Sequence, residues 1–177
     1  MNKPKCIWLT GLPCSGKTTI ANQLIKKYKR KIPNLVSIDG DIVRDLFQND
    51  LGFTKSERII QIKRIQRLSL MLYKQNLFII VSALYSNSAL LNWNKKNFPK
   101  YFEIYLKASV KYVSKRDFKG IYAKQKKDKG YSDIVGVDIP WIAPKKPSLV
   151  IDTEKQSISN TVALIIKKIP ELNKYEN

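Results

Sequence analysis

Eight consecutive residues near the start of the chain have the types and the spacing of a loop that binds phosphate. They match the pattern G-x-x-x-x-G-K-[ST] and read Gly11-Leu12-Pro13-Cys14-Ser15-Gly16-Lys17-Thr18. The glycines let the backbone curl so that successive N–H groups point at phosphate oxygens. Lys17 can reach the β- and γ-phosphates of a nucleoside triphosphate, and the Thr18 hydroxyl can ligate Mg²⁺. A chance match in a chain of this composition has a probability of about 1%.

The residues on either side of this loop also fit phosphate binding. The apolar run from Cys6 to Thr10 predicts a buried strand, and apolar positions with helical spacing follow from Gly16 to about Arg30. The N-terminal dipole of such a helix favours a bound anion. We therefore predict that ATP binds here together with Mg²⁺. The residues of this region expected to contact ATP are Gly11, Pro13, Cys14, Ser15, Gly16, Lys17, Thr18 and Thr19.

Two carboxylates follow a second short apolar run. The run is Leu35 to Ile38, and the residues after it are Asp39-Gly40-Asp41. In a doubly wound sheet the carboxyl ends of the strands form the ligand crevice, where carboxylates can hold Mg²⁺ and accept the proton of an attacking hydroxyl. The same residues would also suit a turn with a helix cap at Asp41. We predict Lys17, Asp39 and Asp41 as catalytic residues, with Thr18 and Asp39 as metal ligands.

Strands and helices alternate along the rest of the chain. Further strands are expected at 77–81, 102–106 and 148–151, and helices at 42–47, 55–75, 110–116 and 157–169. Thr54 or Ser56 could cap the helix at 55–75. The alternation predicts an α/β fold with a doubly wound, mostly parallel sheet, a three-layer sandwich of the P-loop kinase type. Residues 117–146 are dense in Lys, Gly, Asp and Pro and predict a charged lid more than core. One domain over residues 1–177 is expected.

The chain is strongly basic, with 33 Lys and Arg residues against 14 Asp and Glu and a formal net charge of +19. Such a charge attracts nucleic acid, anionic membranes or phosphorylated small molecules, or it forms a solvated basic surface. There is no histidine, so a general base must be a carboxylate, a lysine or a tyrosine. The two cysteines predict neither a disulfide framework nor a metal site. No signal peptide is recognisable and the longest apolar run, Leu77 to Tyr85, is too short for a membrane span, so a cytoplasmic protein is expected.

Several stretches beyond the phosphate loop resemble the adenylylsulfate kinase family. They are Asp39-Gly40-Asp41-Ile42-Val43-Arg44, Asp50-Leu51-Gly52-Phe53-Thr54, Glu57-Arg58, Arg116-Asp117-Phe118-Lys119-Gly120-Ile121-Tyr122, Gly136-Val137-Asp138 and Ala143-Pro144. The phosphate loop is shared with many families, whereas the D-G-D-x-x-R…D-L-G-F run is fairly specific. The resemblance extends from about residue 5 to residue 168.

The resemblance implies roles for individual side chains. Asp39 and Asp41 would serve the metal and the 3′-hydroxyl of the acceptor. Arg44 and Arg58 would bind the phosphate–sulfate group of the acceptor, because the guanidinium fork suits oxyanions, and Phe53 would stack on its base. The full set implied to bind the acceptor is Asp41, Arg44, Phe53, Arg58, Gln61, Leu84, Tyr85, Lys119 and Ile134. Arg116 would lie near ATP, Lys119 would neutralise charge from the lid, and the family implies a homodimer.

On the acceptor side the sequence departs from the family pattern. Gln61-Ile62-Lys63-Arg64 stands where the family usually has Asn-Ile-Arg-Arg, and Leu84-Tyr85-Ser86 stands where it has Ile-Ser-Pro. Ile134-Val135 replaces Phe-Thr, which removes an aromatic partner of adenine. Stacking on an aromatic ring is worth about 1–3 kcal/mol per base. A changed acceptor site beside an intact donor site is expected when a kinase changes acceptor.

The sequence leaves several acceptors open. The first is adenylylsulfate, phosphorylated at its 3′-hydroxyl, and the second is cytidine diphosphoramidate, which relatives of the family phosphorylate during capsular polysaccharide modification. A shikimate- or gluconate-type kinase could carry the same carboxylates, but Phe53 and the lid favour a small nucleotide. The charge suggests a polynucleotide kinase or nucleic-acid-binding protein, although the stretch from Tyr101 to Tyr112 alternates like a buried strand and its helix. The retained Lys17 and Thr18 argue against a non-catalytic nucleotide sensor.

Overall fold

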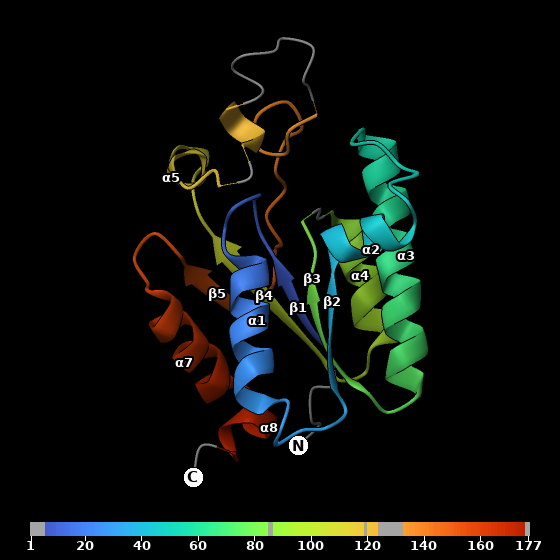
Figure 1. Ribbon diagram of the computed structural model, residues 1–177, viewed down its shortest axis with the longest axis vertical. Helices are drawn as coiled ribbons and strands as arrows, with labels where there is room; N and C mark the ends of the chain where they lie inside the picture. Colours follow the sequence, from blue (N-terminus) through green and yellow to red (C-terminus); the bar gives the residue numbers. More distant parts are fainter. Residues whose placement is uncertain (1–5, 85–86, 119, 124–132, 176–177) are drawn as a thin grey trace.

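The computed structural model describes residues 6–84, 87–118, 120–123 and 133–175, and its centre is a five-stranded sheet (Figure 1). The strands are β1 (Cys6–Thr10), β2 (Leu35–Asp39), β3 (Phe78–Ser82), β4 (Tyr101–Lys107) and β5 (Leu149–Asp152), in the spatial order β2-β3-β1-β4-β5. Each of the four pairings is parallel. The predicted doubly wound α/β fold is therefore confirmed, and the sheet is parallel throughout rather than mostly parallel.

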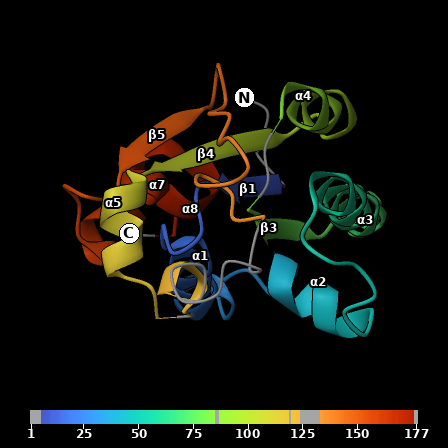
Figure 2. The same cartoon turned by 90° about the horizontal axis from the view of Figure 1, so that it is seen from above.

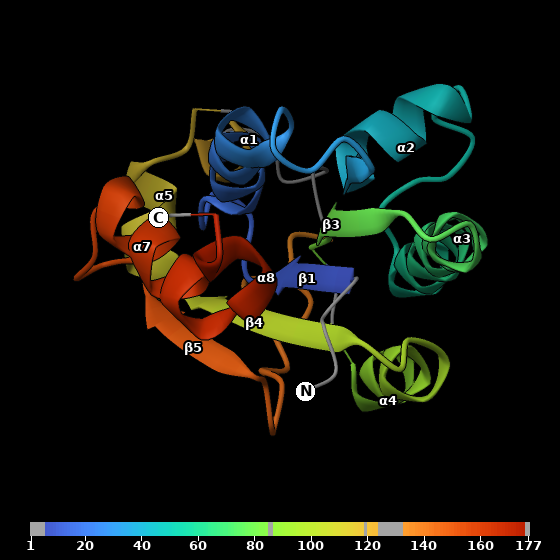
Figure 3. The same ribbon diagram turned by 90° about the horizontal axis from the view of Figure 1, so that it is seen from below.

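Helices cover both faces of this sheet. The helices include α1 (Lys17–Tyr28), α2 (Gly40–Leu46), α3 (Lys55–Lys74), α4 (Ser88–Asn97), α5 (Val110–Lys115), α7 (Ile158–Lys168) and α8 (Pro170–Asn173). Apolar side chains of α1, α7 and α8 form one core cluster with the sheet, and those of α3, α4 and α5 form the other. Figure 2 shows α2 beside α3, and Figure 3 shows α7 beside α1, with α8 next to α7.

The sequence predicts most of these elements to within one or two residues, but it does not predict α4 or α8. Three of the ten residues of α4 are asparagine, a weak helix former. The helix forms because Asn87 caps its first turn and because Leu90, Leu91 and Asn94 are buried against the molecule. Tertiary packing thus outweighs a poor local propensity.

The central strands carry continuous apolar runs because both of their faces are buried. All five residues of β1 and all five of β3 are buried. Thr54 caps helix α3: its hydroxyl accepts from the Glu57 backbone N–H, while the Glu57 carboxylate accepts from the Thr54 N–H. Thr54, and not Ser56, is therefore the cap.

The predicted charged lid at 117–146 lies partly outside the described residues, and the described part contributes several apolar residues to the core. Tyr122, Ile134, Val135 and Ile139 are buried and join the cluster beneath α3. These apolar residues fall in short stretches among many charged ones, so the composition of the segment does not predict their burial. Gly136 has a φ of 97° and its backbone packs against Leu12 of the phosphate loop, where a Cβ would lie 2.7 Å from a leucine methyl group. None of the helices in the described parts of the chain has the length and apolar character that a membrane crossing requires.

Candidate active site

A pocket of about 290 Å³ lies where β1, β2 and β3 end, at the carboxyl edge of the sheet. The predicted residues that line it are Pro13, Cys14, Gly16, Lys17, Thr18, Thr19, Asp39, Asp41, Arg44, Phe53, Arg58, Gln61, Leu84 and Ile134. Parallel strands bring these residues together, because their carboxyl ends share one edge. Gly11, Ser15 and Arg116 do not line the pocket, and Tyr85 and Lys119 lie outside the described residues.

The phosphate loop has the backbone geometry that its glycines suggested. A Cβ at Gly11 would lie 2.5 Å from the Leu106 carbonyl oxygen, so no other residue fits there without displacing β4. Gly16 adopts a φ of 95° and precedes α1 without offering a capping side chain. The N–H groups of the first turn of α1 therefore have no side-chain cap and suit an anion.

Lys17 bridges the two ends of this loop. Its Nζ donates to the Gly11 carbonyl at 3.0 Å and to the Leu12 carbonyl at 2.7 Å. These carbonyl oxygens hold the ammonium group across the mouth of the loop. Phosphate oxygens are stronger acceptors, since they add a charge–charge attraction to the hydrogen bond. The side chain is therefore placed to exchange carbonyl oxygens for a phosphate group.

The Thr18 hydroxyl and the Asp39 carboxylate form a second polar centre. Thr18 Oγ1 donates to Asp39 Oδ2 at 2.7 Å, and Asp39 Oδ1 accepts from the Asp41 backbone N–H at 2.9 Å. Asp39 is thus the cap of α2, in place of the alternative cap at Asp41. Asp39 is buried, whereas Asp41 is exposed and lines the pocket. The two carboxylates therefore have different environments and are suited to different tasks.

A neighbouring hydroxyl adds to the polar groups of this centre. Ser82 lies opposite Asp39 in the sheet register, lines the pocket, and its buried Oγ has no hydrogen-bond partner among the described residues. A buried hydroxyl of this kind requires water or a ligand. Within the described residues no three His, Cys, Asp or Glu side chains cluster. A cation here would rely on Thr18, Asp39, water and phosphate oxygens, which is the usual coordination of Mg²⁺.

The other half of the pocket is built around the ring of Phe53. The Arg44 guanidinium carbon lies 4.6 Å from the ring centroid and that of Arg58 lies 5.3 Å from it. Both arginines are buried, whereas the Phe53 side chain is 49% exposed. The structure therefore brings together the three acceptor-binding residues that the family resemblance implied, with a half-exposed aromatic ring beside two cations.

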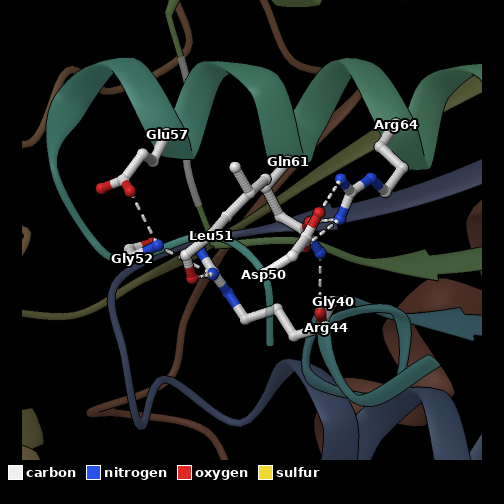
Figure 4. Close-up of polar contacts among 8 residues, drawn as sticks. All are labelled: Gly40, Arg44, Asp50, Leu51, Gly52, Glu57, Gln61 and Arg64. Atoms are coloured by element: carbon white, nitrogen blue, oxygen red, sulfur yellow. Dashed lines mark hydrogen bonds and ion pairs between the residues drawn. The ribbon is translucent and has the colours of Figure 1, made fainter. Parts of the chain in front are cut away.

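Backbone carbonyls hold both guanidinium groups in place. Arg44 Nη1 donates to Leu51 O at 2.8 Å and to Gly52 O at 3.0 Å (Figure 4). Arg58 Nε donates to Phe53 O at 2.7 Å and its Nη2 donates to Asp133 O at 2.7 Å. Burial lowers the pKa of Arg44, but an arginine remains a cation in proteins. The pocket thus contains two preorganised positive charges suited to an oxyanion.

Apolar side chains complete the pocket, and the sequence predicted only some of them. Ile62, Ile65, Phe118, Ile121 and Val135 line it without having been predicted, as do Gly40, Ser82 and Asp133. Ser82 ends β3 at the carboxyl edge, so applying the strand-end rule to every strand would have found it. Phe118 and Ile121 fall within the stretch that resembled the family, which was a usable signal. Ile134 lines the pocket, and its contact with an acceptor stays a prediction.

Arg116 lies beside the pocket rather than in it. Its guanidinium carbon is 5.5 Å from the Tyr112 ring centroid, and with Asp117 and Tyr122 it lines a neighbouring hollow. Asp117 Oδ1 accepts from the Ile121 N–H at 2.8 Å, so this carboxylate shapes the turn that returns the chain to the pocket. The contact between Arg116 and ATP stays a prediction.

The model of the family described as Adenylylsulphate kinase matches residues 3–152. The chain belongs to the adenylylsulfate kinase family. Among curated relatives, the cytidine diphosphoramidate kinase of Campylobacter jejuni is 33% identical over 168 residues, covering 95% of this chain and 98% of that protein. A probable adenylyl-sulfate kinase of Synechocystis is also 33% identical, covering 96% of each chain. The prediction of a kinase of this family is confirmed.

Solved structures give the same fold. The crystal structure of APE1195 superposes with a TM-score of 0.79 at 30% identity and covers 97% of each chain. The Mycobacterium tuberculosis APS kinase CysC, in complex with AMPPNP and APS, superposes with a TM-score of 0.81 at 24% identity, covering 96% of this chain and 99% of that one. As an adenylylsulfate kinase family member, the chain has the P-loop kinase fold that its sequence indicated.

Proposed function

We propose that this adenylylsulfate kinase family member transfers the γ-phosphoryl group of ATP, with Mg²⁺, to a ribose hydroxyl of a small nucleotide that carries a modified anionic phosphate. One observation carries the proposal: a single pocket contains a phosphate loop, two carboxylates, and an aromatic ring flanked by two cations. The loop suits the donor, and the ring with Arg44 and Arg58 suits a base and its anion. The carboxylates lie between these two halves in the sequence and share the pocket with both.

On the donor side, Lys17 and Thr18 carry the main roles. Lys17 exchanges the loop carbonyls for phosphate oxygens and stabilises charge on the transferring group. Thr18 donates a hydrogen bond to Asp39, which leaves the lone pairs of the Thr18 hydroxyl oxygen to face a cation. Thr18 and Asp39 would hold Mg²⁺, which would supply positive charge to offset that of the phosphates. Asp39, whose two oxygens already accept from Thr18 and the Asp41 N–H, serves this cation and the local geometry.

Asp41 is the better placed of the two carboxylates to act on the acceptor. It is exposed in the pocket, whereas Asp39 is buried. The acceptor hydroxyl oxygen forms the new bond to the γ-phosphorus, the bond from that phosphorus to the bridging oxygen breaks, and ADP leaves. Asp41 accepts the hydroxyl proton. Positioning and electrostatic stabilisation supply most of the catalysis.

Adenylylsulfate is the first acceptor to consider, because the chain belongs to the adenylylsulfate kinase family and a relative at 33% identity is a probable adenylyl-sulfate kinase. A specific observation favours cytidine diphosphoramidate as the second. The pocket wall at Ile134 is aliphatic, where the family resemblance implied a phenylalanine, so this position lacks an aromatic partner for adenine. A Campylobacter jejuni relative of nearly identical length is a cytidine diphosphoramidate kinase.

The test is ADP release from Mg·ATP with each acceptor in parallel, followed by mass spectrometry of the product. We expect turnover with one of the two nucleotides and a product heavier by one phosphoryl group. Single-stranded DNA and shikimate serve as unrelated acceptors, and Asp41→Asn as an inactive control. Absence of turnover with both nucleotides would overturn the proposal, and turnover with DNA alone would support the polynucleotide kinase alternative. The expected homodimer stays a prediction that light scattering can check.

A further inference from the structure

A series of side-chain contacts connects the loop between α2 and α3, residues 47–54, to the start of α2. These contacts lie outside the phosphate loop. Arg64 of α3 forms two parallel hydrogen bonds with Asp50, from Nη1 to Oδ1 at 2.9 Å and from Nη2 to Oδ2 at 2.8 Å (Figure 4). Its guanidinium carbon also lies 3.9 Å from the Phe47 ring centroid. Arg64 thus contacts Phe47 and Asp50, which begin and end the first half of this loop.

An ion pair near the surface usually contributes little, because two long side chains must be ordered and solvent screens their charges. This pair differs in geometry. The guanidinium is bidentate, and the Arg64 side chain is only 18% exposed because it lies over Phe47. The arginine is therefore largely ordered before Asp50 binds it, and the pair is suited to fixing the position of the loop.

The series of contacts continues from Arg64 into the pocket through Gln61. Arg64 Nη1 donates to Gln61 Oε1 at 3.4 Å, and Gln61 Nε2 donates to the Gly40 carbonyl at 3.2 Å. Gln61 is 4% exposed and lines the pocket. Gly40 is the first residue of α2 and stands between the two carboxylates of the site. The connection therefore reaches from the loop to the backbone that carries Asp39 and Asp41.

The same face of α3 holds the second half of the loop. Glu57, Gln61 and Arg64 are spaced i, i+4 and i+7, so they project from one side of the helix. Glu57 Oε1 accepts from the Gly52 N–H at 2.9 Å, and a Cβ at Gly52 would lie 2.8 Å from this carboxylate. A side chain at position 52 would therefore require the Glu57 carboxylate to shift from its present position.

The position of this loop determines the position of the acceptor-binding groups. Its backbone carbonyls at Leu51, Gly52 and Phe53 accept the hydrogen bonds that orient the two guanidinium groups. The Phe53 ring is itself part of the loop. A displacement of the loop would move the stacking surface and release Arg44 and Arg58 from their partners.

From these contacts we propose that Arg64, through Asp50 and Gln61, is a positioning residue that couples the acceptor half of the pocket to the carboxylates at the start of α2. Its use in acceptor binding rests on the proposed function. The structural coupling itself depends only on the contacts described above. The two parts of the proposal are therefore tested by different readouts.

Steady-state kinetics test the functional part with the better acceptor from the activity panel. We expect Arg64→Met and Asp50→Asn each to raise the acceptor KM about 5- to 30-fold while the ATP KM changes less than about twofold. The double variant should be no worse than the poorer single variant, since both remove one interaction. Arg64→Lys should remain impaired, because lysine cannot supply two parallel N–H groups.

Arg67→Met is the matched control. Arg67 lies one turn further along α3, and its guanidinium carbon is 5.8 Å from the Trp93 ring centroid, away from the pocket. Its replacement removes an arginine–aromatic contact from the same helix and should leave both KM values unchanged. Equal rises in the two KM values, strictly additive single effects, or an unchanged acceptor KM in Arg64→Met would overturn the acceptor role.

Hydrogen exchange tests the structural part without any substrate. Arg64→Met should speed amide exchange about tenfold in peptides covering residues 40–46 and 47–54, while Arg67→Met should not. Unchanged exchange in both peptides would overturn the coupling. If the wild-type protein phosphorylates neither nucleotide but Arg64→Met still speeds exchange, the proposed function fails and the coupling stands.

Discussion

Removal of the Phe53 ring is the perturbation whose size can be worked out most directly from the structure. Stacking of a base on an aromatic ring is worth about 1–3 kcal/mol, and each 1.4 kcal/mol corresponds to a factor of about ten. The ring is 49% exposed and also contacts two guanidinium groups at 4.6 and 5.3 Å. The loss of these contacts would loosen both cations as well as the base. Phe53→Ala should therefore raise the acceptor KM about 10- to 100-fold.

The assay is steady-state ADP release with each substrate varied in turn. The ATP KM should change less than about twofold, since Phe53 is on the opposite half of the pocket from the phosphate loop. Ile60→Ala is the control, because Ile60 on α3 has nearly the same exposure, 48%, and does not line the pocket. Phe53→Tyr, which keeps an aromatic face, should recover most of the affinity. Equal rises in both KM values, or a change in the acceptor KM no larger than that of Ile60→Ala, would refute the stacking role.

Three further outcomes are expected. Lys17→Ala should lower kcat by at least about 10²–10³-fold with either acceptor, and retained turnover in ADP-release assays would argue against the phosphate-loop role. Gly136→Ala should lower the free energy of unfolding by about 1–3 kcal/mol in urea titrations, because its Cβ would lie 2.7 Å from a leucine methyl group of the phosphate loop. Gly120 also has a positive φ, 66°, but an added Cβ there would meet nothing within 4 Å. Gly120→Ala therefore measures the backbone strain alone and should lower the free energy of unfolding by less than Gly136→Ala does; equal losses would contradict the packing argument. Hydrogen bonds from Thr54 and Gly52 lower the pKa of Glu57 in the folded protein. Its stabilising contribution is therefore present above the unfolded-state pKa and is lost as the pH falls through the lower folded-state pKa. Glu57→Gln should remove this part of the acid dependence of stability, which urea titrations at several pH values would measure.

Local signals in the sequence were strong where one short segment carries both the structure and the chemistry. The phosphate loop needs a strand, glycines and a helix start in direct succession, and all three lie within residues 6–28. The capping box at Thr54 and Glu57 is likewise complete within four residues. Such features depend on neighbours along the chain, so a pattern can predict them.

Other features depend on partners that are distant in sequence. The burial of Tyr122 and Ile134 within a segment rich in charge follows from packing under α3, which composition does not show. The same holds for α4, which folds against the core despite three asparagines. The coupling of Asp50 to Gly40 through α3 requires a helix face to meet a loop, and the sequence shows only the spacing of Glu57, Gln61 and Arg64.

The sequence by itself determined the order of the strands and of most helices, the phosphate loop, the two carboxylates after β2 and the family resemblance, because each is encoded in consecutive residues. Only the tertiary structure decided that Asp39 is buried and Asp41 is exposed, although both line the pocket. It also decided that Arg44 and Arg58 flank one aromatic ring and that Arg64 supports the loop carrying it. These outcomes depend on burial and on contacts across the fold, where solvent exclusion and backbone carbonyls from other elements fix the orientation and the charge environment of each group.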